Sequence, residues 1–141
     1  MMDIRLCRNA FVQLLKVINK EYDTTYNFNL FNNGRHSLMK SISIDKPSFY
    51  ALYKKDFFNS FGKMYPCEPS GVGESINIEW LDLALSLSVD YLIFVYPTGY
   101  VYIISPKLVK RYCESRGLIR EQYEGESTYV FPVMLLERVG V

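Results

Sequence analysis

Residues 91–105 constrain the fold most, because they predict a β-hairpin whose two faces are both apolar. Pro97-Thr98-Gly99 suits a three-residue turn with the glycine in the left-handed conformation, and this turn sets the register of the strands. Side chains alternate across a strand, so the register predicts an aromatic face of Leu92, Phe94, Tyr96, Tyr100, Tyr102 and Ile104 and an aliphatic face of Ile93, Val95, Val101 and Ile103. Since neither face is polar, both must be covered, as in a layered α/β domain.

Length and composition indicate one globular domain, which we expect to span residues 1–141. A chain that is 49% hydrophobic and 16% aromatic is too apolar to be intrinsically disordered. Cys7, Cys67 and Cys113 are widely spaced, and the single histidine, His36, lies in a polar stretch where we expect it to be solvated. This pattern argues against a disulfide framework and a structural zinc site. We therefore expect a cytoplasmic protein without membrane contact, since charged residues interrupt the N-terminal apolar run.

The remaining pattern places helices and strands along the whole chain. Apolar spacing and helix-terminal residues predict helices at residues 4–22, at about 75–88 and from Pro106 to Gly117, and a short final helix from Pro132. Alternating or aromatic runs predict strands near residues 27–33, at Ser41–Asp45, Phe49–Phe58 and Ser127–Phe131, with a loop at residues 62–73.

Charge is unevenly distributed, although the formal net charge is only +1. Residues 35–63 hold six basic residues against two aspartates, and residues 107–120 hold five against Glu114, whereas residues 74–90 hold four acids and no base. Such blocks are typical of a basic face for nucleic acid, and equally of solvated faces that happen to cluster. The candidate nucleic-acid contacts are Arg35, Lys40, Lys46, Lys63, Lys107, Lys110 and Arg111.

The order of these elements over residues 4–116 resembles that of the PD-(D/E)XK nucleases. It is closest to archaeal Holliday junction resolvases and to the small nuclease-like proteins of archaeal viruses. The resemblance implies a restriction endonuclease-like fold, a mixed central sheet flanked by helices, and a magnesium-dependent endonuclease or junction resolvase that hydrolyses DNA. In that family an aspartate ends the second strand and Glu-x-Lys lies on the third. The carboxylates bind magnesium, which activates a water.

The residues of this chain match that motif only in part. Asp45 falls at the aspartate, and Lys54 or Lys55 falls at the lysine, but Leu52 and Tyr53 stand where the glutamate would be. Some family members move this carboxylate to the following helix, which implies Glu79, or Glu74 at the start of that helix, as its substitute. The resemblance therefore implies Asp45 and Glu79 as magnesium ligands and catalytic residues, with Lys54 or Lys55 beside the scissile phosphate. The residue types alone leave a turn aspartate and a structural ion pair as alternatives.

Two functional hypotheses follow from the incomplete motif. The first is a magnesium-dependent nuclease acting on DNA. The second is a module on the same scaffold that has lost its acidic pair and binds nucleic acid or a protein partner. We expect a homodimer under either hypothesis, because an unused apolar hairpin face would suit a symmetric contact. Residues 71–75 also suit a phosphate-binding loop before a helix, although their glycines equally suit a simple turn.

Overall fold

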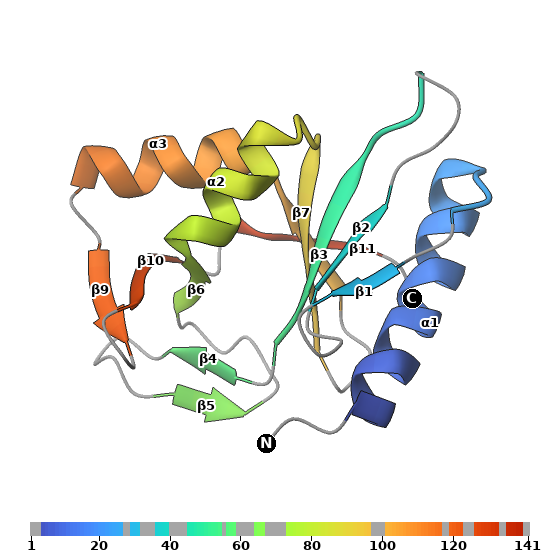
Figure 1. The fold of residues 1–141 in the computed structure, drawn as a ribbon, viewed down its shortest axis with the longest axis horizontal. Helices are drawn as coiled ribbons and strands as arrows, with labels where there is room; N and C mark the ends of the chain where they lie inside the picture. The colour runs from blue at the N-terminus through green and yellow to red at the C-terminus, as the bar shows by residue number, and fades with distance from the viewer. Residues whose placement is uncertain are drawn as a thin grey trace.

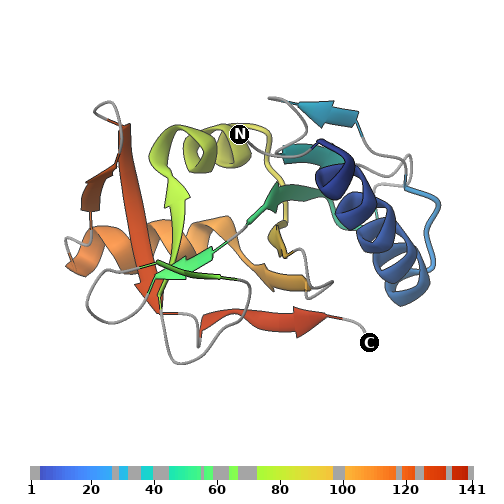
Figure 2. The same ribbon diagram turned by 90° about the horizontal axis from the view of Figure 1, so that it is seen from below.

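The computed structural model describes residues 4–26, 29–31, 36–39, 45–54, 56–58, 64–66, 73–96, 101–116, 119–122, 126–132 and 135–139. These residues form three α-helices and two β-sheets (Figure 1), so the protein has a mixed α/β architecture. The helices are α1 (Ile4–Tyr22), α2 (Ile78–Ser86) and α3 (Pro106–Arg116). Helix α1 lies at one end of the molecule and β9 and β10 lie at the other (Figures 1 and 2).

The larger sheet has six strands in the order β1-β2-β3-β7-β8-β11. Their bounds are β1 Asn29–Phe31, β2 His36–Met39, β3 Phe49–Tyr53, β7 Tyr91–Val95, β8 Val101–Ile104 and β11 Glu137–Val139. Only β3 and β7 run parallel, and every other neighbouring pair is antiparallel. A parallel pair needs a crossover connection, and the chain makes it through the second sheet and α2.

The smaller sheet has five strands, all antiparallel, in the order β5-β4-β6-β10-β9. Their bounds are β4 Asp56–Phe58, β5 Met64–Pro66, β6 Gly73–Asn77, β9 Ile119–Gln122 and β10 Glu126–Pro132. Strands β4, β5 and β6 come from the connection between β3 and β7, whereas β9 and β10 follow α3. Segments more than 40 residues apart in the sequence therefore meet where β6 pairs with β10, as in Ile76 opposite Tyr129.

The hairpin of β7 and β8 has the predicted register. Ile93 lies opposite Ile103, Val95 opposite Val101, and Phe94 opposite Tyr102. The turn residues 97–100 are outside the described part of the chain. Because the pairing of residues 92–95 with residues 101–104 follows the prediction, the assignment of these side chains to their faces is confirmed.

Both faces of the hairpin are covered, as predicted. The aliphatic face packs with α1, whose Phe11, Leu14 and Ile18 are fully buried. The aromatic face packs with α2, α3 and the smaller sheet through residues such as Val109 and Phe131. The larger sheet is thus the middle layer between two separate apolar cores, and burial of these side chains supplies the main stabilisation of the fold.

Three predicted element boundaries are wrong. The helix predicted at about 75–88 begins at Ile78, because residues 73–77 pair with β10 and the Asn77 side chain caps the helix by accepting from the backbone of Glu79 at 2.8 Å. The long strand predicted at Phe49–Phe58 is two strands in different sheets. The helix predicted from Pro132 does not begin there, since Pro132 ends β10; β11 pairs with the edge of β8, and residues 133–134 lie outside the described part of the chain.

The remaining predicted elements match the structure in part. Helices α1 and α3 have the predicted extents, with Gly117 outside the described residues. The antiparallel partner of β3 is β2, and residues 41–44 of the predicted strand are not described. Strand β5 lies within the predicted loop 62–73, and β9 was not predicted.

Candidate functional site

Lys54 and Glu74 form an ion pair where the two sheets meet. The ammonium of Lys54 lies 3.3 Å from Oε1 of Glu74 and donates a hydrogen bond to the carbonyl oxygen of Ser75 at 2.8 Å. It also lies 5.8 Å from the centre of the Phe94 ring. The Glu74 side chain is fully buried, and the Lys54 side chain is 19% exposed. The pair therefore ties the end of β3 in one sheet to β6 in the other.

Strand geometry explains why Glu74 points inward. Glu74 and Ile76 are two residues apart on β6, so their side chains point to the same face, and both are buried. Oε1 of Glu74 also accepts a hydrogen bond from the backbone nitrogen of Ser75 at 2.7 Å. The resemblance implied Glu79, or Glu74, as the substitute for the family's glutamate, and the structure places Glu74 beside Lys54. Lys55 lies outside the described residues.

Asp45 lies at the other end of β3. It is exposed in the turn before that strand and lines a hollow of about 370 Å³ with Tyr22, Lys46, Pro47, Asp90 and Tyr91. Asp90 holds the start of β3, because its Oδ2 accepts hydrogen bonds from the nitrogen and the hydroxyl of Ser48 at 2.8 and 3.2 Å. Five residues of β3, about 16 Å of strand at ~3.3 Å per residue, separate this hollow from Lys54.

Glu79 is exposed in the first turn of α2. The last turn of α2 leads to Asp90, so the nine residues of the helix, about 13 Å at ~1.5 Å per residue, separate Glu79 from the hollow that contains Asp45. The structure therefore does not bring Asp45 and Glu79 together.

Asp45 and Glu79, as the structure places them, do not fit a magnesium ion held between them. Two carboxylates that share this ion must lie roughly 4 to 5 Å apart, given its short bonds to oxygen, and Asp45 and Glu79 lie at separate places. Glu74 has the Lys54 ammonium against it, which opposes a cation at the same oxygen. Within the described residues no group of three or more His, Cys, Asp or Glu could hold a metal. Magnesium-dependent cleavage stays a prediction from the resemblance.

The predicted basic residues differ in how their charges are used. Lys110 lies 3.2 Å from Asp82 and 3.9 Å from Glu114, and the hydrogen bond to Asp82 raises its pKa. Lys107 and Arg111 are exposed and have no ion pair within the described part of the chain. Lys46 donates a hydrogen bond to the carbonyl oxygen of Tyr22 at 3.0 Å. Arg35, Lys40 and Lys63 lie outside the described residues.

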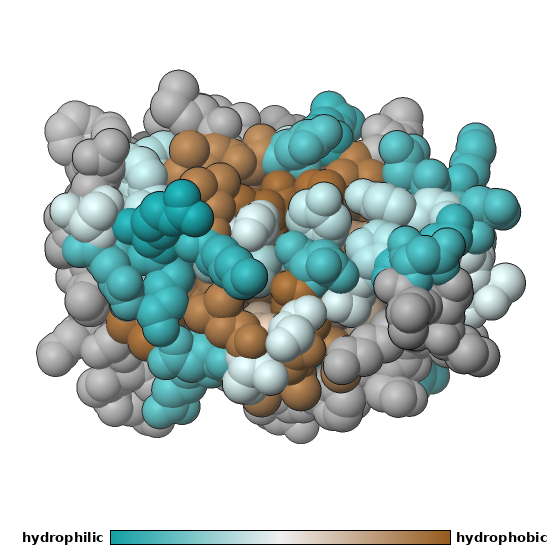
Figure 3. Space-filling model, turned by 90° about the horizontal axis from the view of Figure 1, so that it is seen from above, coloured by the Kyte–Doolittle hydropathy of each residue, from teal (hydrophilic) through white to brown (hydrophobic). Residues whose placement is uncertain are grey.

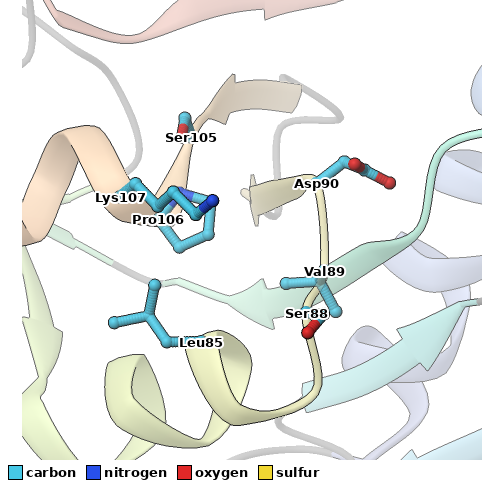
Figure 4. Close-up of a pocket in the computed structure, with 7 residues that line it drawn as sticks. All are labelled: Leu85, Ser88, Val89, Asp90, Ser105, Pro106 and Lys107. Carbon is cyan, nitrogen blue, oxygen red and sulfur yellow. The ribbon is translucent and has the colours of Figure 1, made fainter.

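A second hollow, of about 270 Å³, lies beside the first. It is lined by Leu85, Ser88, Val89, Asp90, Ser105, Pro106 and Lys107, from the end of α2 and the start of α3 (Figure 4). Asp90 lines both hollows, so the two adjoin. Lys46 lines the first hollow and Lys107 lines the second. Figure 3 looks onto this side of the molecule, where hydrophilic and hydrophobic residues lie intermixed.

A buried aromatic cluster was missed at the sequence level. His36 was expected to be solvated, but it is 7% exposed on β2, and its Nδ1 is hydrogen-bonded to the hydroxyl of Tyr50. The centre of its ring lies 4.7 Å from that of Trp80. Burial raises the pKa of Tyr50 to about 12. In the sequence, Tyr50 lies between apolar residues of a predicted strand, which indicates that it is buried. Nothing in that pattern identifies His36 as its hydrogen-bond partner.

Comparison of the chain with protein-family models, with curated proteins and with solved structures finds no match. Among the described helices none is both long enough and apolar enough to cross a membrane.

Proposed function

We propose that the protein handles DNA by binding it on the side of the two hollows, on a nuclease-like layout, without hydrolysis at Asp45 and Glu79. The layout is supported by the order of elements. Helix α1, the antiparallel run β1-β2-β3, helix α2, the hairpin β7-β8 and the basic helix α3 occur in this order, with β4, β5 and β6 between β3 and α2. The PD-(D/E)XK nucleases share the order of the first-named elements.

The observation that carries the proposal is the contrast between Lys54, which is ion-paired, and two cations of α3, which are not. Lys54, one of the two lysines predicted for the lysine position of the layout, is held by buried Glu74 at 3.3 Å. Lys107 and Arg111 are exposed, lie one helical turn apart on the same face of α3, and have no ion pair among the described residues. Cations without an acidic partner can release the counterions of phosphates, which is the main source of non-specific affinity for DNA.

Fluorescence anisotropy with labelled duplex, single-stranded and four-way junction DNA tests this proposal. Affinity should fall steeply between about 50 and 200 mM salt, because phosphate contacts release counterions. Lys46→Gln, Lys107→Gln and Arg111→Gln should each weaken binding to all sequences and lower the slope of log affinity against log salt by about 1. A wild-type protein that binds none of these DNAs at low salt would overturn the proposal and favour a protein partner.

A cleavage assay tests the second half of the proposal. The same DNAs, incubated with magnesium or manganese and with EDTA as the control, should stay intact. Cleavage that needs the metal and is lost in folded Asp45→Asn would contradict us, because the amide keeps the size of the side chain while removing its charge. Such a result would restore the nuclease hypothesis and place Asp45 in its site.

A further inference from the structure

The outer face of α1 is basic along most of its length. Its exposed residues between positions 8 and 20 are Arg8, Asn9, Val12, Gln13, Lys16 and Lys20. Three of the six are cations and none is an acid, so the face carries only positive charge until Glu21. Like Lys107 and Arg111 of α3, these three have no ion pair within the described part of the chain.

The opposite face of α1 is buried in the core. Phe11, Leu14 and Ile18 are fully buried against the larger sheet. An amphipathic helix that inserts into a membrane surface needs its apolar face free, and in this fold it is not free. The surface that α1 offers is therefore a row of cations and polar groups without an apolar anchor, which suits a regular array of phosphates better than a lipid interface.

We propose that this face of α1 is a second DNA-contacting surface that binds the phosphate backbone of a duplex. The inference rests on the proposed function and extends it to a part of the molecule outside the predicted basic segments. From Arg8 to Lys20 the helix spans about 18 Å at ~1.5 Å per residue, which matches about five base pairs at ~3.4 Å each. The face also adjoins the first hollow, because Lys46 is hydrogen-bonded to Tyr22 at the end of α1.

The test compares a charge-removing variant with a matched neutral one. Arg8→Gln/Lys16→Gln/Lys20→Gln should weaken binding to duplex DNA and lower the slope of log affinity against log salt by about 2.7, at ~0.9 per phosphate contact. Asn9→Ala/Gln13→Ala, on the same face, should leave both values unchanged. The charge-keeping variant Arg8→Lys/Lys16→Arg/Lys20→Arg should retain the slope. If the triple glutamine variant fails to fold, the single variants should each lower the slope by about 1.

The outcomes separate this inference from the proposed function. Wild-type binding that persists in the triple glutamine variant with an unchanged slope overturns the role of α1 and leaves the surface at Lys107 and Arg111 standing. A wild-type protein that binds no DNA overturns both. Binding to vesicles of phosphatidylserine and phosphatidylcholine that the triple variant loses, with no effect of that variant on DNA, would contradict the inference and assign the face to an anionic membrane.

Discussion

The ammonium of Lys54 lies 3.3 Å from the carboxylate of Glu74, and this carboxylate is fully buried between the two sheets. Removing charges from water costs free energy, which the attraction between the two groups and their hydrogen bonds must offset. Lys54 meets this condition by bonding to the carbonyl oxygen of Ser75 as well. Lys54, one of the two lysines predicted near a phosphate in a nuclease layout, thus joins β3 to β6.

Removing one partner of this pair should destabilise the protein strongly. Lys54→Met leaves the Glu74 charge buried without its cation, so the free energy of unfolding should fall by about 3 kcal/mol. Lys54→Met/Glu74→Leu should recover part of this loss, because neither charge remains. Urea unfolding of Lys54→Met, of Glu74→Leu and of the double variant measures the coupling free energy between the two side chains. Additive effects of the single changes would mean that the pair contributes no coupling to stability.

A carboxylate in the aliphatic core should unfold the chain. Val101 is 2% exposed and lies opposite Val95 on the face covered by α1. Val101→Asp buries an unpaired charge, which should reduce the free energy of unfolding by more than about 4 kcal/mol. The same change at Val12, which is 37% exposed on the outer face of α1, is the matched control and should shift stability by less than about 1 kcal/mol. Equal melting temperatures for the two variants would contradict the assignment of the faces.

Cys113 should be unreactive in the folded protein. It is fully buried on α3, and burial raises the pKa of its thiol from 9.0 to about 11. Between pH 9 and 11 the Cys113 thiol ionises in the unfolded chain but stays protonated in the folded one. The thiol therefore contributes stability below about pH 9 that is lost as the pH rises toward 11. In Cys7→Ser/Cys67→Ser, a thiol reagent at pH 8 should react only after denaturant is added. Fast labelling of that folded variant would show that the thiol is accessible.

The bond between Tyr50 and His36 should contribute to stability at neutral pH. Tyr50→Phe removes the hydroxyl that is bonded to Nδ1 of His36, so we expect a loss of about 1 kcal/mol. Burial raises the pKa of Tyr50 from 10.0 to about 12. The wild type should therefore lose stability between pH 10 and 12 that the phenylalanine variant does not lose. Fluorescence of Trp80, the single tryptophan, follows unfolding next to this cluster, and identical alkaline profiles would contradict the prediction.

Local patterns were sufficient to predict the elements that local forces define. Helix α1 has an apolar stripe over many turns, and the β7-β8 register follows from its turn, so both match the structure. The prediction for residues 73–77 does not match, because the strand conformation of this segment depends on pairing with β10, about 50 residues later. No local signal contains such a pairing.

The structure places the candidate site residues differently from the prediction for a related reason. The prediction of a helix from about residue 75 made Glu79 a substitute carboxylate for the third strand, with Glu74 at the helix start. In the structure the helix begins at Ile78, which leaves Glu74 on a strand next to Lys54 and Glu79 exposed on α2. Asp45 was expected at the end of a strand paired with β3, whereas the antiparallel partner of β3 is His36–Met39 and residues 41–44 lie outside the described part of the chain. A shift of a few residues was enough to separate the predicted pair.

The salt dependence of DNA binding by two neighbouring variants of α3 tests the central claim most directly. Lys107 has no ion pair among the described residues, whereas Lys110 lies 3.2 Å from Asp82. If unpaired cations beside the hollows bind phosphates, Lys107→Gln should lower the slope of log affinity against log salt by about 1, and Lys110→Gln should leave it nearly unchanged. Equal slopes for the wild type and Lys107→Gln, or a larger loss in Lys110→Gln, would contradict the proposed DNA-binding surface.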